Sequence, residues 1–330
     1  MARIALIGGT GTISAHCVAA LAGEGHQVTA IVRGTASRGP PPSGAKLMCA
    51  DRDDPGALAR ALTAVTPEAV LDFACFTPDQ ALVLAGSLPA SARQVILVST
   101  VDVYGLPLPR LPMTEAEPWA VPASPSAAAK REAEDALAAT LHGAATTVVR
   151  PTYSLGPGFV ISPFSRDGRT MLARLRLGLP VPVPGAGETL IHPSDATDTG
   201  RMIAALTLRD AAFGRDYTVG TPDATMTHRA YVETIAAALG LQARLAEIDR
   251  AQLLAPGGLP ADSLYLELTR RDLSYALDRV LHDLPGFCAK TDLATRVRAW
   301  AARHDPADDA RLAGEGEGAL VPATGRQGEL

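Results

Sequence analysis

The stretch that decides the fold lies at the start of the chain, where residues 3–14 read RIALIGGTGTIS. The short apolar run 3–8 is typical of a buried strand. Residues 12–25 carry apolar side chains near helical spacing and end in glycines. Between them, Gly8 lets the chain turn tightly and Gly11 lets the backbone approach a pyrophosphate. The sequence therefore predicts a strand–loop–helix unit that cradles the phosphates of a dinucleotide at the helix start.

The third small position of this glycine loop is occupied by Ser14 rather than glycine. Serine is small enough for the helix to pack closely against the strand, so we expect the loop to keep its geometry. A turn that binds no ligand is the alternative, but a loop at the first strand–helix junction of an alternating chain favours binding. The loop residues expected at the cofactor are Gly8, Thr10, Gly11, Thr12 and Ile13.

Strands and helices alternate through the first half of the sequence. The apolar runs are continuous, which is typical of strands covered on both faces, and the intervening helices imply parallel pairing. We therefore predict an α/β fold, a Rossmann doubly wound parallel sheet with a smaller C-terminal substrate-binding subdomain. The expected strands are 3–8, 26–34, 45–50, 68–76, 94–100 and 146–151, and the expected helices are 12–25, 53–65 and 124–143.

The domain boundaries follow from where this alternation weakens. Residues 1–155 form the predicted dinucleotide-binding domain, and 191–220 are expected to return to it. Glycine and proline punctuate the chain beyond this point, so 156–190 and 221–305 are assigned to the substrate-binding subdomain. The small, polar sequence of 306–330 predicts a flexible tail.

Charge and composition exclude several classes of function. The chain of 330 residues carries a net charge of −5 and lacks a Lys/Arg run, so no nucleic-acid partner is expected. No apolar stretch approaches the roughly 20 residues that span a bilayer, which argues against a membrane protein. The cysteines are scattered without a C-x-x-C pair, which is typical of reduced, mostly buried thiols in a cytoplasmic protein without a metal site. They are Cys17, Cys49, Cys75 and Cys288.

The end of the second strand distinguishes the two nicotinamide dinucleotides. An NAD site usually places a carboxylate there for the ribose hydroxyl, but this strand ends in VRG (32–34), with Arg38 nearby. An arginine pairs instead with a 2′-phosphate, so NADP is favoured over NAD; a solvated loop residue is the alternative for Arg33. Asp51 and Arg52 follow the third strand, where the adenine is expected.

Several further motifs resemble those of the extended short-chain dehydrogenase/reductases, the NAD-dependent epimerase/dehydratase group. The resemblance covers roughly residues 1–300, and VTAIVRGTAS at 28–37 is similar to the same stretch of NADP-using GDP-mannose 4,6-dehydratases. The motifs are DFAC at 72–75, STVDVYG at 99–105, RPTYSLGPG at 150–158 and IHPSDATD at 191–198. By this resemblance, the further cofactor contacts are Phe73, Ala74, Cys75, Ser99, Lys130 and Pro151.

The resemblance implies hydride transfer at a nicotinamide, with a Ser/Thr, a Tyr and a Lys arranging the proton. Thr100 falls at the Ser/Thr position, and Lys130 falls at the lysine position, where it would hold the nicotinamide ribose. The tyrosine of the Y-x-x-x-K pattern is replaced by Ser126. A serine hydroxyl is far less acidic than a phenol and its side chain is much shorter, so Ser126 would at best hold a water in the proton path.

Three other residues are candidates for moving the proton. Asp102 falls where family dehydratases resemble T-D-E-V-Y-G, at the position of a Glu that acts as a base, while Val101 takes the place of the neighbouring acid. Tyr104 and Tyr153 are expected to face the pocket, where each would offer a phenol. A loop-capping role for Asp102 and packing roles for the two tyrosines are the alternatives.

The substrate side also departs from the resemblance. Sugar-nucleotide members resemble R-x-x-I-H-x-x-D, in which the arginine clamps the diphosphate, but Glu188 stands at that position. This argues against a nucleotide sugar unless another cation takes over, and we interpret His192 in the same motif as a structural histidine. The available cations are Arg169, Arg174 and Arg176.

Three functions fit these residues. The first, which we favour, is an NADP-dependent oxidoreductase or epimerase/dehydratase-like enzyme that acts on a hydroxyl or ketone of a small molecule in a biosynthetic pathway. The second is a non-redox enzyme that catalyses elimination, cyclisation or isomerisation, for which the missing tyrosine is the motive. The third is an NADP-sensing binding protein. The substrate stays open because pocket residues decide it, and so does the oligomeric state, with a homodimer common among relatives.

Overall fold

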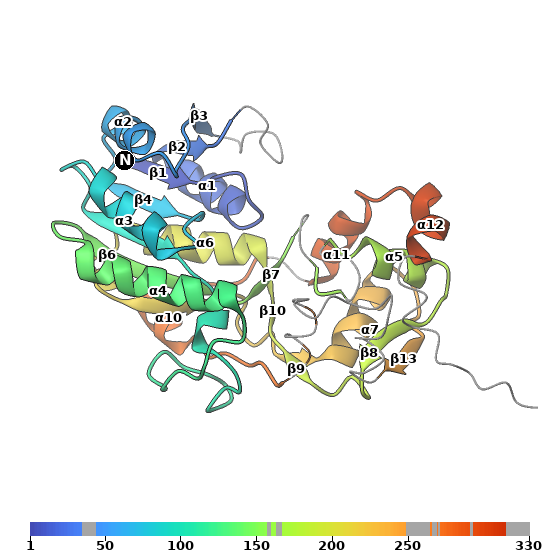
Figure 1. The fold of residues 1–330 in the computed structure, drawn as a ribbon. Coiled ribbons are helices and arrows are strands. Elements are labelled where there is room, and N and C mark those ends of the chain that lie inside the picture. Colours follow the sequence, from blue (N-terminus) through green and yellow to red (C-terminus); the bar gives the residue numbers. More distant parts are fainter. Residues whose placement is uncertain are drawn as a thin grey trace, which may run out of the picture. The chain divides into compact units, whose positions relative to one another are not determined.

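A computed structural model gives the architecture of the chain (Figure 1). The chain divides into two compact units. Unit 1 comprises Met1–Ser154, Ser194–Asp223 and Tyr275–Lys290, and unit 2 comprises Leu155–Pro193, Ala224–Ser274 and Thr291–Leu330. The structure describes residues 1–34, 44–156, 160–162, 167–248, 265, 269, 271–290 and 293–314.

Unit 1 is built on a seven-stranded sheet in which neighbouring strands run parallel. The strand order is β11-β6-β5-β4-β1-β2-β3, so the chain starts inside the sheet, builds outward to β3, and then returns to build the other side (Figure 1). This order confirms the predicted α/β fold with a Rossmann doubly wound sheet. The strands are β1 (Arg3–Ile7), β2 (Gln27–Val32), β3 (Ala45–Cys49), β4 (Ala69–Asp72), β5 (Gln94–Val98), β6 (Ala145–Pro151) and β11 (Asp216–Val219).

Alternate residues of β1 belong to two different hydrophobic cores, one on each face of the sheet. Ile4 and Leu6 belong to the first core, whereas Ala5 and Ile7 belong to the second. Both faces are therefore covered by helices, which explains why the strands read as continuous apolar runs. The first core is covered by α1 (Ser14–Gly23), α6 (Ala196–Leu206) and α10 (Asp278–Asp283), and the second by α2 (Pro55–Val65), α3 (Pro78–Ser87) and α4 (Pro125–Thr140).

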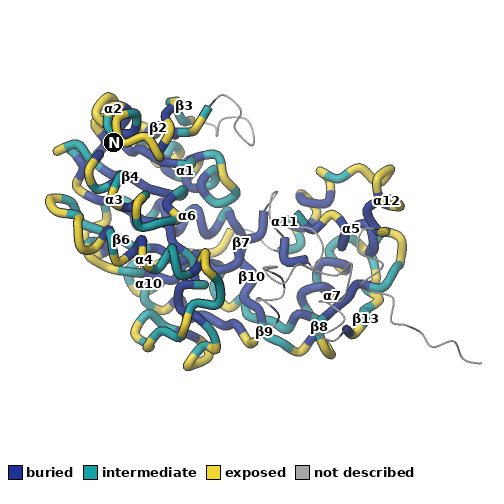
Figure 2. The backbone as a smooth tube through the Cα atoms, viewed as in Figure 1, coloured by how far each residue is buried: buried dark blue, intermediate teal, exposed yellow. Residues whose placement is uncertain are grey.

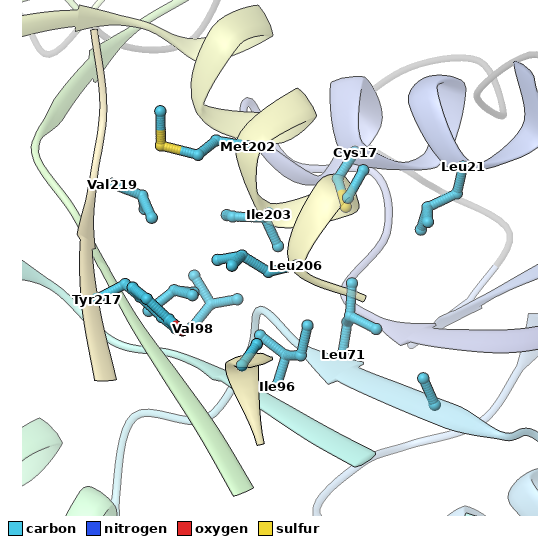
Figure 3. Close-up of a cluster of buried hydrophobic side chains, with 14 of the residues drawn as sticks. Cys17, Leu21, Leu71, Ile96, Val98, Met202, Ile203, Leu206, Tyr217 and Val219 are labelled. Atoms are coloured by element: carbon cyan, nitrogen blue, oxygen red, sulfur yellow. The ribbon is translucent and has the colours of Figure 1, made fainter. Parts of the chain in front are cut away.

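The first core joins segments that are far apart in the sequence. Figure 3 shows Cys17 of α1 and Leu206 of α6 facing Leu71 and Ile96 of the sheet. All four side chains have no exposed surface, and the backbone tube of Figure 2 is coloured as buried along the central strands. The central strands are thus packed on both faces, which leaves their ends to form a site.

The helix that carries Lys130 begins at a cap encoded in the sequence. Ser124 precedes α4, and its hydroxyl accepts a hydrogen bond from the amide of Ala127 at 3.2 Å. Pro125 occupies the first helical position, where its missing N–H costs nothing. The cap fixes where α4 starts and thereby sets the position of Lys130 in its second turn.

Unit 2 contains short strand pairs and helices. Strand β8 pairs in parallel with β13, and β9 pairs antiparallel with β12. Strands β7 (Tyr153–Leu155) and β10 (Pro193–Asp195) pair with each other where the chain passes from one unit to the other. The remaining elements are α5 (Arg169–Arg176), β8 (Val181–Pro184), β9 (Leu190–Ile191), β12 (Met226–Thr227), α7 (His228–Ala238), β13 (Leu245–Ile248), α11 (Leu293–Ala301) and α12 (Asp309–Ala313).

Two C-terminal segments differ from the sequence-based division. Tyr275–Lys290 belongs to unit 1, because Leu277 and Val280 join the first core instead of the substrate-binding subdomain. Residues 306–314, assigned above to a flexible tail, form a 3-10 turn and α12. Leu312 is buried there, and Arg174 donates a hydrogen bond to the Ala313 carbonyl at 2.9 Å. Residues 315–330 lie outside the described residues.

The structure can be compared with what the composition predicted for the cysteines, for membrane-spanning helices and for metal sites. Cys17 and Cys75 are buried, but Cys49 and Cys288 are exposed, so the expectation of mostly buried thiols holds for half of them. All four are free thiols. In the part of the chain that the structure describes, no helix has the length and apolarity to cross a bilayer, and no cluster of His, Cys, Asp or Glu would hold a metal ion.

The close crossing of α1 and α6 gives a test of the first core. A Cβ on Gly200 would lie 2.7 Å from the Cys17 amide nitrogen and 2.9 Å from the Ile13 carbonyl oxygen, and neither backbone atom can move freely. We expect Gly200→Ala to lower the free energy of unfolding by about 1–3 kcal/mol, measured by urea denaturation. The matched control is Gly86→Ala in α3, where nothing lies within 4 Å, and a gain of about 0.5–1 kcal/mol is expected. Equal effects of the two changes would contradict the close crossing.

Candidate active site

The glycine loop after β1 is held by its own serine. The hydroxyl of Ser14 accepts a hydrogen bond from the amide of Gly11 and donates one to the carbonyl of Gly8, both at 2.8 Å. Gly8 has a φ of +78°, which a residue with a side chain rarely adopts. Sequence analysis treats Ser14 only as a small residue, and the structure adds that it fixes the turn.

The loop presents the start of α1 in the way a dinucleotide needs. The N-cap residue of α1 is Ile13, and no side chain caps the helix. Thr10 and Thr12 lie in the same loop, and Gly11 is exposed. Free amides at a helix start attract phosphate groups, so this part of the site fits the pyrophosphate of a dinucleotide.

The residues expected around the adenosine part of the cofactor separate into two groups. Arg33 and Asp51 are exposed, and the Asp51 carboxylate accepts a hydrogen bond from the amide of Asp53 at 3.0 Å. Arg52 instead turns inward and is 4% exposed. The structure therefore leaves Arg33 and Asp51 accessible to a ligand but not the charged end of Arg52, and Arg38 lies outside the described residues.

Arg52 pairs with a buried carboxylate at the end of β4. Its Nη2 donates to Oδ2 of Asp72 at 2.5 Å, and the other oxygen of Asp72 accepts from the amide of Ala74 at 2.8 Å. Burial raises the pKa of the Asp72 carboxyl, while the guanidinium opposes that rise. Sequence analysis missed this pair, although an acid at the end of an apolar strand was a usable signal.

The segment that follows β4 lies against the glycine loop. A Cβ on Gly8 would lie 3.2 Å from the Cβ of Ala74, so the two loops are in contact. Phe73 and Ala74 are partly exposed, whereas Cys75 is buried. Burial and the Asp72 carboxylate raise the pKa of the Cys75 thiol to about 11, so this cysteine is a packing group and not a nucleophile.

Two further residues expected at the cofactor lie at the ends of β5 and β6. Ser99 is 7% exposed, and its hydroxyl oxygen is buried without a hydrogen-bond partner. An unpaired buried hydroxyl is costly, so it fits a site that a polar ligand completes. Pro151 is buried at the end of β6.

Lys130 lies in α4 close to these strand ends. Its Nζ donates a hydrogen bond to the carbonyl of Val98 at 3.0 Å and lies 4.7 Å from the ring centre of Phe76. Burial lowers the pKa of Lys130, and the nearby acids, including Asp72 and Asp102, oppose the shift. Ser126, at the position of the missing phenol, is exposed one turn earlier in the helix.

Thr100, Asp102 and Tyr153 form one hydrogen-bonded group. The Thr100 hydroxyl donates to Oδ2 of Asp102 at 3.0 Å, and the Tyr153 phenol donates to Oδ1 at 2.7 Å. Burial raises the pKa of Asp102, although both donors favour its charged form. Burial and the carboxylate raise the pKa of Tyr153 well above its usual value. Such a group can bind the oxygen of a substrate and exchange a proton with it.

Tyr104 does not join this group. Its side chain has no exposed surface, and its phenol is 2.8 Å from the Thr218 hydroxyl and accepts from Arg150 at 3.3 Å. The expectation that Tyr104 faces the pocket is therefore not met, because partners from β6 and β11 hold its hydroxyl inside unit 1. The packing alternative describes this tyrosine.

Two of the three arginines considered for a substrate diphosphate are engaged elsewhere in unit 2. Arg174 donates to the carbonyls of Pro180 and Ala313, and Arg176 lies 3.4 Å from the Asp309 carboxylate. The two arginines thus hold α12. Glu188 is 73% exposed, and Arg169 is exposed beside Asp167.

His192 lies in the motif that includes the Glu188 position. It is 1% exposed, and its Nδ1 is 3.2 Å from the hydroxyl of Thr225, which in turn contacts the hydroxyl of Ser274. A ring nitrogen that is buried and hydrogen-bonded within the protein is not available to a substrate. This geometry agrees with the structural role expected for His192.

Solved structures with the same fold include UDP-glucose 4-epimerases and a protein of the short-chain dehydrogenase/reductase superfamily. UDP-glucose-4-epimerase of Stenotrophomonas maltophila, solved with NAD, has a TM-score of 0.73 at 17% identity and covers 92% of this chain and 98% of its own. The UDP-glucose 4-epimerase of Bifidobacterium longum, solved with NAD+ and UDP, has a TM-score of 0.72 at 17% identity, with 92% and 99% covered. A short-chain dehydrogenase/reductase of Agrobacterium tumefaciens with NAD has a TM-score of 0.67 at 20% identity, with 95% and 99% covered.

Sequence comparisons lead to the same group of enzymes. The 2'-dehydrokanamycin reductase of Streptomyces kanamyceticus is 29% identical over 216 residues, which is 64% of this chain. The match spans only 60% of the length of that relative. The model of the NAD dependent epimerase/dehydratase family matches residues 4–220. The chain therefore belongs to the NAD dependent epimerase/dehydratase family.

Proposed function

We propose that the protein is an NADP-dependent reductase that converts a ketone of a small polar molecule to an alcohol in a biosynthetic pathway. The observation that carries this proposal is the Asp102 carboxyl, which is hydrogen-bonded to the hydroxyls of both Thr100 and Tyr153. This group contains a phenol and a titratable acid, which the Ser126 hydroxyl at the family tyrosine position does not supply. The related 2'-dehydrokanamycin reductase supports reduction as the direction of the reaction.

The ketone would be a modest-sized polar ring rather than a nucleotide sugar. Glu188, an acid, stands where the family motif has the arginine that clamps the diphosphate, and its carboxylate pairs with Arg229 at 3.7 Å. Arg174 and Arg176 support α12 and are engaged there, and the third candidate, Arg169, lies beside the Asp167 carboxylate. The name of the curated relative favours a ketone on an aminoglycoside-like ring as the first substrate to assay.

The cofactor would lie along the strand ends of unit 1, and when bound it supplies the hydride. The glycine loop and the start of α1 would hold its phosphates, and Ser99 would pair its buried hydroxyl with the cofactor. The Lys130 ammonium has three donors, of which one goes to the Val98 carbonyl, so others would reach the ribose hydroxyls. Arg33 would pair with a 2′-phosphate.

The proton would then follow the hydrogen-bonded group. Thr100 turns its hydroxyl to the ketone oxygen, and Tyr153 passes its phenol proton to that oxygen as the alcohol forms. Tyr153 takes a replacement proton from Asp102, which enters the cycle protonated and afterwards takes up the one proton that the reduction consumes from solvent. Burial raises the pKa of Asp102, which favours the protonated form that this step uses.

The reaction itself is tested with a panel of ketones and both reduced dinucleotides. We expect oxidation of NADPH, followed by nicotinamide absorbance, with aminoglycoside-type ketones that include 2'-dehydrokanamycin, and no turnover of 4-keto nucleotide sugars. A product that forms with no net change in the nicotinamide would contradict the reductase proposal and favour a non-redox enzyme.

The choice of NADP depends on Arg33. We expect Arg33→Ala to weaken NADPH binding about 10- to 100-fold, because a charge-assisted hydrogen bond contributes roughly 1.5–3 kcal/mol, and to leave NADH binding unchanged. Isothermal titration calorimetry measures both affinities. Arg60→Ala, at an exposed position of α2, is the control and is expected to bind both like the wild type. Tighter binding of NADH than NADPH by the wild type would contradict the proposed preference.

The proton route predicts a pH dependence. Reduction needs protonated Asp102, so kcat is highest below the pKa of this carboxyl and falls as the pH rises through it; burial places that pKa above the usual value of about 3.9. Asp102→Asn cannot donate the proton, so kcat should fall about a hundredfold or more and lose this dependence. Asp135→Asn, at an exposed position of α4, is the control. An unchanged pH profile in Asp102→Asn would exclude the route.

A further inference from the structure

The turn that carries Asp102 is attached to α4 by the side chain of Arg131. The Nε of Arg131 donates a hydrogen bond to the carbonyl of Val103 at 2.9 Å, and its Nη2 donates to the same oxygen. Nη2 also donates to the carbonyl of Ala120 at 2.8 Å. One guanidinium thus joins three segments, which are α4, the turn at 101–104 and the loop around Ala120.

Lys130 and Arg131 hold the two ends of one short segment of the chain. Lys130 donates to the carbonyl of Val98 at 3.0 Å, where β5 ends, whereas Arg131 donates to the carbonyl of Val103. Successive residues of a helix are turned by about 100°, so the two side chains leave α4 in different directions. The segment between the two attachment points contains Ser99, Thr100 and Asp102.

The guanidinium of Arg131 is itself held by an aromatic ring. Its Cζ lies 4.9 Å from the ring centre of Trp119, and the Cζ of Arg150 lies 4.6 Å from the same ring. Arg150 is fixed in turn, because its Nη2 donates to Oε2 of Glu134 at 2.8 Å. A guanidinium that stacks on an aromatic ring keeps its plane and its donors in one orientation.

The turn and the loop around Ala120 lie in close contact. A Cβ on Gly105 would lie 2.4 Å from the carbonyl oxygens of both Ala120 and Val121. The amide of Ala120 donates to the carbonyl of Tyr104 at 2.8 Å. Because the Val103 and Ala120 carbonyls share one nitrogen of Arg131, loss of the guanidinium removes a donor from both segments at once.

We propose that Arg131 is a positioning residue, which fixes the turn bearing Thr100 and Asp102 relative to Lys130. Its donors go to main-chain oxygens, so it acts on the reaction only through the turn that it holds. This role rests on the proposed function, in which the turn serves the proton and Lys130 serves the cofactor that supplies the hydride. Both must reach the same ketone, so their relative placement affects the rate.

Arg131→Lys keeps the positive charge but removes the planar fork of donors. We expect kcat for ketone reduction to fall about 10- to 100-fold, because a displacement of about 1 Å can slow a reaction by about a hundredfold. KM for NADPH should stay within about twofold, since the glycine loop and Lys130 are unchanged. The control is Arg60→Lys, the same change at an exposed position of α2, which should keep the wild-type kcat.

Amide hydrogen exchange measures the hold on the turn without any turnover. The amides of Val103 and Gly105 lie 3.3 and 3.1 Å from the carbonyl oxygens that accept their hydrogen bonds within the turn. We expect Arg131→Lys to speed exchange about tenfold in peptides spanning 99–106, followed by mass spectrometry, and Arg60→Lys to leave it unchanged. Exchange in α7 of unit 2 should be the same in both variants and the wild type. Thermal unfolding shows whether each variant keeps its fold.

The two readouts separate the inference from the proposed function. A wild-type kcat in folded Arg131→Lys would overturn the positioning role, and so would unchanged exchange at 99–106. Faster exchange throughout both units would indicate a general loss of stability and would also contradict that role. If the wild type reduces no ketone but exchange rises only at 99–106, the hold of Arg131 on the turn stands and the reductase proposal alone is wrong.

Discussion

The carboxyl ends of parallel strands all lie at the same edge of a sheet, and this constraint brings together the residues that we propose bind the cofactor and transfer the proton. Strands β1, β4 and β5 leave the sheet there, followed by the glycine loop, the segment after Asp72 and the turn that holds Thr100 and Asp102. The strand order reverses between β1 and β4, and such a reversal opens a crevice in which dinucleotides bind. Residues as remote in sequence as Asp102 and Tyr153 are thereby held at hydrogen-bond distance by rigid elements.

Two carboxyl groups lie at this edge, Asp72 buried and Asp102 partly buried, and their partners favour different roles. An isolated buried charge is costly, so each acid needs partners. Asp72 faces the permanent cation of Arg52, which opposes its protonation. Asp102 has two neutral hydroxyl donors, and its nearest influential cation, Lys130, acts without a direct hydrogen bond to it. Asp72 is therefore suited to holding loops together, and Asp102 to changing its protonation state.

The sequence predicts the fold because its signals are local, whereas the site depends on distant partners. Apolar runs and glycine spacing can be recognised within one element, and they located the six sheet strands of the first half of the chain but not helix α3 or the short strands of the second half. Tyr104 and Tyr153 carry the same phenol, so their sequence does not tell them apart. The contacts with Arg150 and Thr218, which lie on strands remote in sequence, hold the Tyr104 hydroxyl in the interior of unit 1. Arg52 turns inward for a similar reason, since its partner belongs to another strand. No local pattern contains that information.

The phenol of this site, that of Tyr153, lies in strand β7, whereas the family resemblance places the tyrosine at the start of a helix. The two positions give the phenol different charged neighbours. In the Tyr–Lys arrangement that the family resemblance implies, a cation lowers the pKa of the phenol. Tyr153 faces the Asp102 carboxylate instead, which together with burial raises its pKa. A phenol with a raised pKa is a poor proton donor unless a neighbouring acid supplies a new proton to its oxygen in the same step. In the proposed mechanism Asp102 therefore stores the proton that Tyr153 transfers, and Lys130, bonded to the Val98 carbonyl, serves the cofactor.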